Sequence, residues 1–125
     1  MDERLVRNAK AALSQLLELR EGENFLVVTD EATLQVGEAF RTAAEAFGTR
    51  PASYVLLEDQ RPLKEIPEEL MALVPDVDVA VTCFAGRVEE TPFRIALLQA
   101  LCKVARRVGH APGITIDMLR EGPME

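Results

Sequence analysis

The chain has 125 residues, which is enough for one domain that buries roughly two thirds of the surface of the unfolded chain. Apolar residues make up 48% of the composition, which excludes a disordered chain. Acidic residues outnumber basic residues by 21 to 14, and the net charge is -7. Because a negatively charged protein repels phosphate backbones, we expect no nucleic-acid partner.

The cellular compartment is predicted from the N-terminal segment and the cysteines. Residues 1–20 are charged and amphipathic, so we expect no signal peptide. No run approaches the roughly 20 apolar residues of a membrane helix, and we expect a cytoplasmic protein without a membrane partner. Cys83 and Cys102 lie in apolar patterns that predict buried, reduced thiols. Eleven Arg against three Lys, with no Trp, is typical of GC-rich and some thermophilic sources.

Helices and strands alternate along the first half of the chain. Leucine and alanine recur at three- and four-residue spacing over residues 2–20 and predict a helix that Gly22 ends. Residues 25–29 form a continuous apolar run, which is typical of a strand covered on both faces. Asp30 is then predicted to cap a second helix over residues 31–47.

The middle of the chain continues the same order of elements. Strands are predicted at residues 53–57 and 77–84, with a polar loop and a short helix at 67–73 between them. Strands that alternate with helices indicate right-handed crossovers in a parallel sheet. We therefore expect one α/β domain over residues 1–125, a three-layer open and mostly parallel sheet of about four strands with helices on both faces.

The last third of the chain completes this domain. Thr91 is predicted to cap a long helix that ends near Arg107, with Pro92 as its first residue. A short strand at 108–111 and a helix at 115–121 follow. Late in the long helix, three basic residues complement the helix dipole: Lys103, Arg106 and Arg107.

The carboxyl ends of parallel strands form the edge at which ligands bind in such folds. Three segments are predicted to meet there, at residues 29–33, 82–87 and 112–115. The candidate ligand-binding residues at this edge are Asp30, Thr82, Arg87, Thr91, His110 and Thr115. For four of them a structural role competes with ligand contact, because Asp30, Thr91 and Thr115 also suit helix caps and His110 suits a polar residue packed under the edge.

Motifs for cofactors, metals and catalysis are absent or weak. The chain has neither the glycine pattern of dinucleotide-binding turns nor a Walker A motif, and we expect no cofactor. One histidine and two separated cysteines do not supply a structural zinc site, so no metal is expected. Cys83 with His110 is the one candidate nucleophile–base pair. Four carboxylates near the edge are expected on a solvated acidic surface: Glu89, Glu90, Asp117 and Glu121.

Three segments resemble a known family. They are GENFLVVTDEATLQVGEAFRTAAEAFG at 22–48, VDVAVTCFAGRVEETPFRIAL at 77–97 and HAPGITIDML at 110–119. Together they are similar to the N-terminal domain of the aminopeptidase T type of dinuclear-metal leucyl aminopeptidases. The resemblance implies a flavodoxin-like or Rossmann-like α/β unit that contributes to the substrate cleft and the dimer of those enzymes.

The resemblance also implies which functions are missing. In that family, the His, Glu, Asp and Tyr metal ligands belong to a separate C-terminal domain, and none has a counterpart here. The initiating Met1 and the short tail after the last predicted helix favour a complete small protein, with a fragment of the enzyme as the alternative.

Three hypotheses about function follow. The first is a non-catalytic, free-standing domain that forms a homodimer or binds another protein chain. The second is a small-molecule binder at the carboxyl ends of the strands. The third, behind both, is a hydrolase that uses Cys83 and His110, or a fragment of a metal-dependent aminopeptidase whose metal domain a separate chain supplies.

Overall fold

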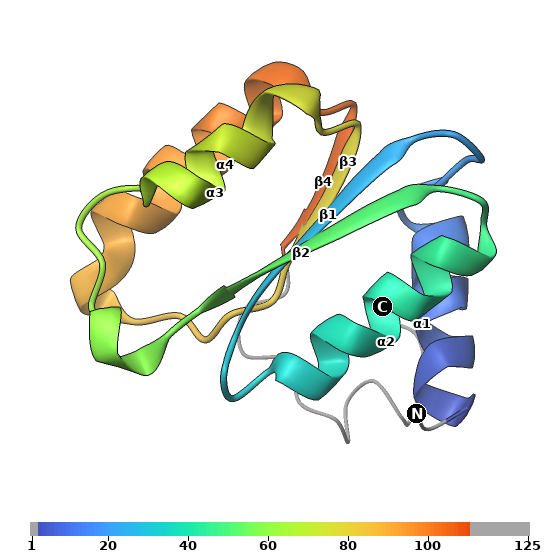
Figure 1. Ribbon diagram of the computed structural model, residues 1–125, viewed down its shortest axis with the longest axis horizontal. Coiled ribbons are helices and arrows are strands. Elements are labelled where there is room, and N and C mark those ends of the chain that lie inside the picture. Colours follow the sequence, from blue (N-terminus) through green and yellow to red (C-terminus); the bar gives the residue numbers. More distant parts are fainter. Residues whose placement is uncertain (1–2, 111–125) are drawn as a thin grey trace.

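The computed structural model describes residues 3–110, and these form an α/β fold around one parallel sheet (Figure 1). The four strands lie in the order β2-β1-β3-β4, and each neighbouring pair is parallel. The strands are β1 (Asn24–Asp30), β2 (Arg50–Leu56), β3 (Val79–Thr82) and β4 (Arg107–His110). The helices are α1 (Glu3–Gln15), α2 (Leu34–Ala46), α3 (Glu68–Leu73) and α4 (Thr91–Val104), with short 3-10 turns η1 (Glu58–Gln60), η2 (Val74–Asp76) and η3 (Val88–Glu90). The predicted fold class is confirmed.

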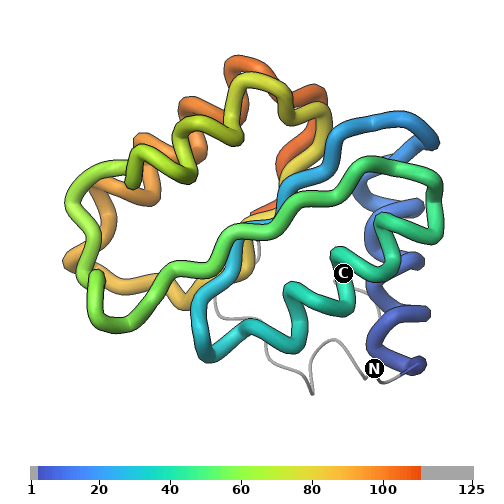
Figure 2. Tube along the Cα trace, in the orientation of Figure 1, coloured from blue at the N-terminus to red at the C-terminus, as the bar shows by residue number. Residues whose placement is uncertain are grey.

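Helices cover both faces of the sheet. Figure 1 shows α1 and α2 on one face and α3 and α4 on the other, and Figure 2 follows the chain as it changes face. A separate apolar core lies under each pair of helices, one around Phe25 and Phe40 and the other around Phe84, Phe93 and Leu97. Strands with both faces covered need apolar side chains on both, which explains the continuous apolar run of β1.

The first helix is shorter than predicted. It ends at Gln15, and Glu18 adopts a positive φ of 48° in the turn that follows. Leu17 and Leu19 are still buried, because this turn directs them into the core beside α1. The apolar spacing up to residue 20 therefore reports burial correctly, although the helix has already ended.

Helix α2 begins three residues later than predicted. The Thr33 N–H and hydroxyl both donate to Oδ1 of Asp30, at 2.9 and 2.8 Å, and hold residues 30–33 in a turn. Thr33 occupies the N-cap position and Leu34 is the first helical residue. Asp30 therefore closes the turn before α2 and does not cap the helix.

The predicted start and end of the long helix are also wrong. Glu90 holds the N-cap position, while the Thr91 hydroxyl donates to the carbonyl of Val88 at 2.8 Å. Helix α4 ends at Val104, so Arg106 lies beyond it and Arg107 begins β4. The three basic residues therefore do not share one helix. Lys103 lies in α4, Arg106 lies between the two elements, and Arg107 begins β4, where it pairs with Val79 of β3.

The two cysteines differ in burial. Cys83 is fully buried, as predicted, but Cys102 is exposed on the outer side of α4, contrary to the prediction. Both are free thiols. Within residues 3–110, no helix has the length and apolarity needed to cross a membrane.

Candidate functional site

The strand order defines where a ligand site is expected. The chain leaves β1 toward β2 on one side and returns to β3 on the other side of β1. The strand order therefore reverses between β1 and β3, and in open α/β sheets ligands bind in the crevice beyond the carboxyl ends of such a pair. Asp30 ends β1 and Thr82 ends β3, so both lie at this position.

Asp30 is fully buried and fully bonded. Its Oδ1 accepts the two bonds from Thr33, and its Oδ2 accepts the backbone N–H of Ala85 at 2.8 Å. The same Oδ2 also accepts a bond from Nη1 of Arg61 at 2.7 Å. Asp30 thereby joins the end of β1 to the loop after β3 and to the loop after β2.

Arg61 fills the crevice with its own side chain. Its guanidinium has no exposed surface, and it lies between Asp30 and Glu90. Nε donates to Oε2 of Glu90 at 2.9 Å, and Nη2 bonds to Oε1 of Glu90 and to the carbonyl of Ala85. The guanidinium therefore bridges two buried carboxylates from elements far apart in the sequence, and Nη1 also lies 3.8 Å from Oε1 of the partly exposed Glu58. We call Asp30, Arg61 and Glu90 the charged triad.

Glu90 completes the triad from the N-cap of α4. Its side chain is 1% exposed, and Oε2 also accepts the backbone N–H of Leu63 at 2.9 Å. The prediction that Glu90 lies on a solvated surface is wrong. Its neighbour Glu89 is exposed, because only one of the two side chains can turn inward at the start of α4.

The triad carries permanent charges. Burial opposes ionisation of Asp30, but bonds from Ala85, Arg61 and Thr33 outweigh it and lower the pKa of this carboxyl. Burial likewise opposes ionisation of Glu90, and its bonds from Arg61 and Leu63 lower its pKa below the ordinary value. The bond to Glu90 raises the pKa of Arg61. None of these groups is therefore poised to exchange a proton near neutral pH.

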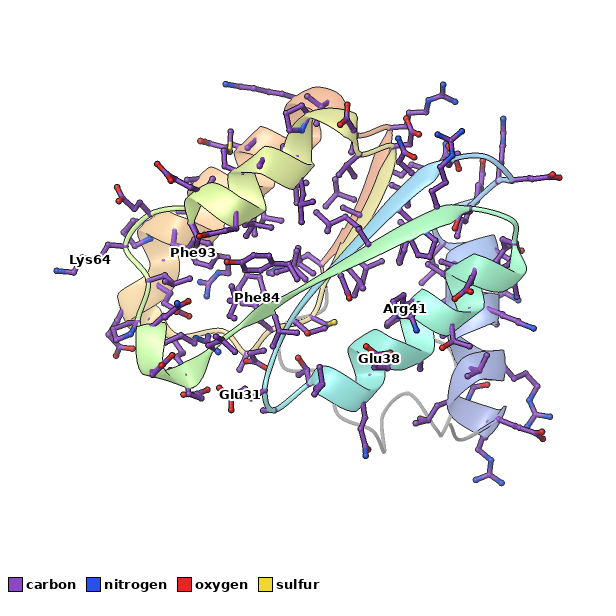
Figure 3. All side chains as sticks on the ribbon, in the orientation of Figure 1. Glu31, Glu38, Arg41, Lys64, Phe84 and Phe93 are labelled. Atoms are coloured by element: carbon purple, nitrogen blue, oxygen red, sulfur yellow. The ribbon has the colours of Figure 1, made fainter. Side chains whose placement is uncertain are left out.

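Outside the triad, the edge holds a looser ion pair. Nη2 of Arg87 donates to both carboxylate oxygens of Glu58, at 2.7 and 2.9 Å, and this pair is partly exposed. The backbone N–H of Glu58 donates to the Glu31 side chain at 2.6 Å. Figure 3 shows Glu31 at this end of the molecule, where it joins the β1–α2 loop to η1.

Thr82 and His110 pair at the ends of β3 and β4. The buried Thr82 hydroxyl and Nδ1 of the exposed His110 share a hydrogen bond. Burial lowers the pKa of His110, and the charge of Arg94 lowers it further, so the imidazole is neutral at pH 7. The ring of Phe84 packs edge-on against the His110 ring. It also packs in a tilted arrangement against the ring of Phe93, and Figure 3 labels both phenylalanines on the side of the sheet that α3 and α4 cover. The bond thus fastens β4 to β3 over an aromatic cluster.

The predicted partnership of Cys83 with His110 does not form. The thiol of Cys83 lies in the core under α1 and α2 and is directed at the carbonyl of Val28, 3.6 Å away. Burial and the charge of Asp30 raise its pKa to about 12. A thiol with this pKa holds its proton at neutral pH and is a poor nucleophile.

The structure brings together part of the predicted site. Asp30 and Thr82 lie at the switch point, Arg87 and Thr91 lie on the loop and helix above it, and His110 lies at the end of β4. Thr115, together with the rest of 112–115, lies outside the described residues. Arg61 was missed, because one arginine in a polar loop carries no signal of burial.

Two hollows lie near the sheet, one at its amino end and one beside the loop that carries Arg61. One, of about 530 Å³, lies between the amino ends of β1 and β2 and the α3–η2 segment. The other, of about 620 Å³, is formed by the loop that leads into α3. None of the five predicted site residues that the structure describes lines either hollow. The same residues 3–110 contain no cluster of His, Cys, Asp or Glu that could hold a metal ion.

The chain was also compared with known proteins. No model of a known protein family matches it, and no curated protein matches it.

Proposed function

We propose that this chain is a non-catalytic α/β association domain that acts by binding a polypeptide, with a second copy of itself as the first candidate. The observation that carries the proposal is the buried guanidinium of Arg61 in the switch-point crevice. This crevice is where the fold would hold a small ligand, and here the chain's own side chain takes that place. Contacts with another protein are then left to the outer surfaces.

The chemistry of the edge supports the same proposal. Thr82 is buried and its hydroxyl is hydrogen-bonded to His110, and Cys83 is protonated in the core, so neither presents a nucleophile at the surface. The carboxylates of Asp30 and Glu90 are saturated with hydrogen bonds. Side chains that are already bonded and buried stabilise loops and do not turn over substrate.

The resemblance to an aminopeptidase N-terminal domain belongs to this proposal. The segments that carry it include β1, α2, β3 and the first half of α4, and a parallel α/β fold is the architecture that the resemblance implies. As a homologue of that domain, the chain would keep the role in assembly and lack the metal chemistry.

Sedimentation velocity tests the proposal on the purified chain from about 1 to about 300 µM. We expect a species of twice the 13.8 kDa subunit mass that dissociates on dilution. A chain that stays monomeric throughout, but whose melting temperature rises with nucleotides, amino acids or short peptides, would overturn association in favour of small-molecule binding.

A further inference from the structure

The outer edge of β2 is a surface at which the sheet can be extended. Among the described residues, β2 pairs only with β1, so its other edge meets no strand. The segment from Pro51 to Leu57 contains no charged residue, although 28% of the chain is charged. Ser53 and Leu57 are exposed. Native proteins usually protect a free edge with charges, proline or shortness. Strand β2 has seven residues, and after Arg50 and Pro51 at its start none of them is charged or a proline.

The backbone of β2 shows which groups face outward. The N–H of Arg50 donates to Glu23 at 3.0 Å and the carbonyl of Gly48 accepts from Gly22 at 3.0 Å, so these even-numbered residues face β1. Backbone groups alternate in direction along a strand. The N–H and carbonyl groups of Ser53 and Val55, and the carbonyl of Pro51, therefore face away from the sheet.

We propose that the outer edge of β2 pairs antiparallel with β2 of a second copy of this chain, about a two-fold axis at Tyr54, to form one continuous sheet. This inference rests on the proposed function, because it names the surface and the partner of that association. A two-fold dimer uses the same patch on both copies, so the edge must complement itself.

Hydrogen bonding selects the position of the axis. With Tyr54 opposite Tyr54, Ser53 lies opposite Val55 of the second copy, and each N–H donates to the other residue's carbonyl. Pro51 lies opposite Leu57, and its carbonyl can accept the Leu57 N–H.

Pro51 has no N–H that could donate to the Leu57 carbonyl of the second copy, and this carbonyl needs no further donor. The carbonyl of Leu57 already accepts the N–H of Gln60 at 3.0 Å within the same chain. This register therefore leaves no outward backbone group of the edge without a partner. If the axis passed through Ser53 instead, Pro51 would face the Val55 carbonyl, which would then lack a donor.

Charge selects the same antiparallel arrangement. Arg50 begins β2, and the described structure contains no ion pair or hydrogen bond of its side chain; Glu58 and Asp59 follow the other end. Antiparallel pairing about Tyr54 places Arg50 opposite Glu58 of the second copy, whose carboxylate is also bonded to Arg87 of its own chain, and next to Asp59, whose side chain makes no ion pair among the described residues. The contact occurs twice by symmetry, and opposite charges at facing positions stabilise strand pairs.

The other edge of the sheet is unsuited to such pairing. Strand β4 has only four residues, and two of them are Arg107 and His110. Arg107 is charged and the neutral His110 is bonded to Thr82, so β4 is both short and committed to its own subunit, and short edge strands resist pairing with another chain. The contrast leaves β2 as the edge through which two copies can extend the sheet.

The first test uses backbone chemistry at Ser53. The variant Ser53→Pro removes an outward N–H that makes no bond within the subunit, and Ser53→Ala keeps that N–H as the matched control. We expect sedimentation to show a monomer for Ser53→Pro and an unchanged dimer for Ser53→Ala. Circular dichroism checks that both variants remain folded.

The second test reverses charges and does not depend on the fold tolerating proline. Arg50→Glu places a carboxylate against Glu58 and Asp59 twice, and we expect its homodimer to weaken roughly tenfold or more. Asp59→Lys places a cation beside Arg50 twice and should weaken its homodimer less, because Glu58 still faces Arg50. Mixed in equal amounts, the two variants should form a heterodimer that is tighter than either homodimer. One of its two contacts is then wild type, and the other joins the carboxylate introduced at position 50 to the ammonium introduced at position 59.

The outcomes separate this inference from the proposed function. If the wild-type chain dimerises and all variants dimerise equally well, with no preference on mixing, then the pairing through β2 is overturned. Association of the chain still stands in that case. A wild-type chain that remains monomeric overturns association itself. Restored affinity only in the mixed sample supports pairing through β2.

Discussion

Two charged clusters hold opposite ends of the same sheet, and they differ chiefly in burial. At the carboxyl end, the charged triad is fully buried, with side chains 0 to 1% exposed. At the amino end, Glu23 accepts from Arg107 at 3.4 Å, and the side chains are 8% and 26% exposed. Both join segments distant in the sequence, but only the triad is shielded from water.

The comparison shows how burial changes the consequence of the same contact. Water screens a partly exposed ion pair, so its loss lowers the free energy of unfolding only slightly. A buried ion that loses its partner keeps the cost of desolvation without compensation. We therefore expect the carboxyl end to tolerate substitution far less than the amino end does.

The largest effect is expected when the guanidinium of the triad is removed. Arg61→Ala leaves the carboxylates of Asp30 and Glu90 buried without their cation, and the free energy of unfolding should fall by about 3–5 kcal/mol. Urea unfolding at pH 7 measures the loss. The matched control Arg87→Ala breaks the partly exposed pair with Glu58 and should cost about 1 kcal/mol or less. Equal losses would contradict the role of burial.

A smaller effect is expected when one carboxylate of the triad is neutralised. Glu90→Gln presents an amide hydrogen where Arg61 or Leu63 donates, so the free energy of unfolding should fall by about 1–3 kcal/mol. Its exposed neighbour provides the control, and Glu89→Gln should change stability by about 0.5 kcal/mol at most. Comparable losses for both variants would show that the triad does not depend on the charge of Glu90.

The triad should also govern the response to acid. The folded-state pKa values of Asp30 and Glu90 are below their ordinary values of 3.8 and 4.5. Their contribution is therefore complete above the unfolded-state values and is lost as the pH falls through the lower, folded-state values. Urea midpoints measured from pH 7 down to pH 3 should fall less steeply for the triple variant Asp30→Asn, Arg61→Met, Glu90→Gln. An unchanged slope would assign acid unfolding to other carboxylates.

The smallest effect is expected at the amino end. Arg107→Met keeps the aliphatic contacts of the side chain but removes its bonds to Glu23 and to the carbonyl of Glu18. The free energy of unfolding should fall by about 1 kcal/mol or less, and high salt should shrink the difference further. A loss as large as that of Arg61→Ala would remove the distinction between the two ends of the sheet.

Local pattern was enough to predict the elements but not all of their ends. The apolar run at residues 25–29 predicted β1, because a strand covered on both faces has no position for a polar side chain. The end of α1 and the start of α2 were misplaced, because the turns at Glu18 and Thr33 depend on backbone conformation and side-chain bonds. Part of the candidate site was found for the same local reason, since Asp30 and Thr82 stand where their strands end.

By itself, the sequence determined the fold class, because the alternation of apolar strands and amphipathic helices is a local property of the chain. Only the tertiary structure decided that Arg61 meets Asp30 across 31 residues and Glu90 across 29. A charge can be buried only where other segments supply its partners, and the spacing of apolar residues in the sequence does not show which segments these are. The same holds for β2, whose open edge follows from the strand order and not from its own residues.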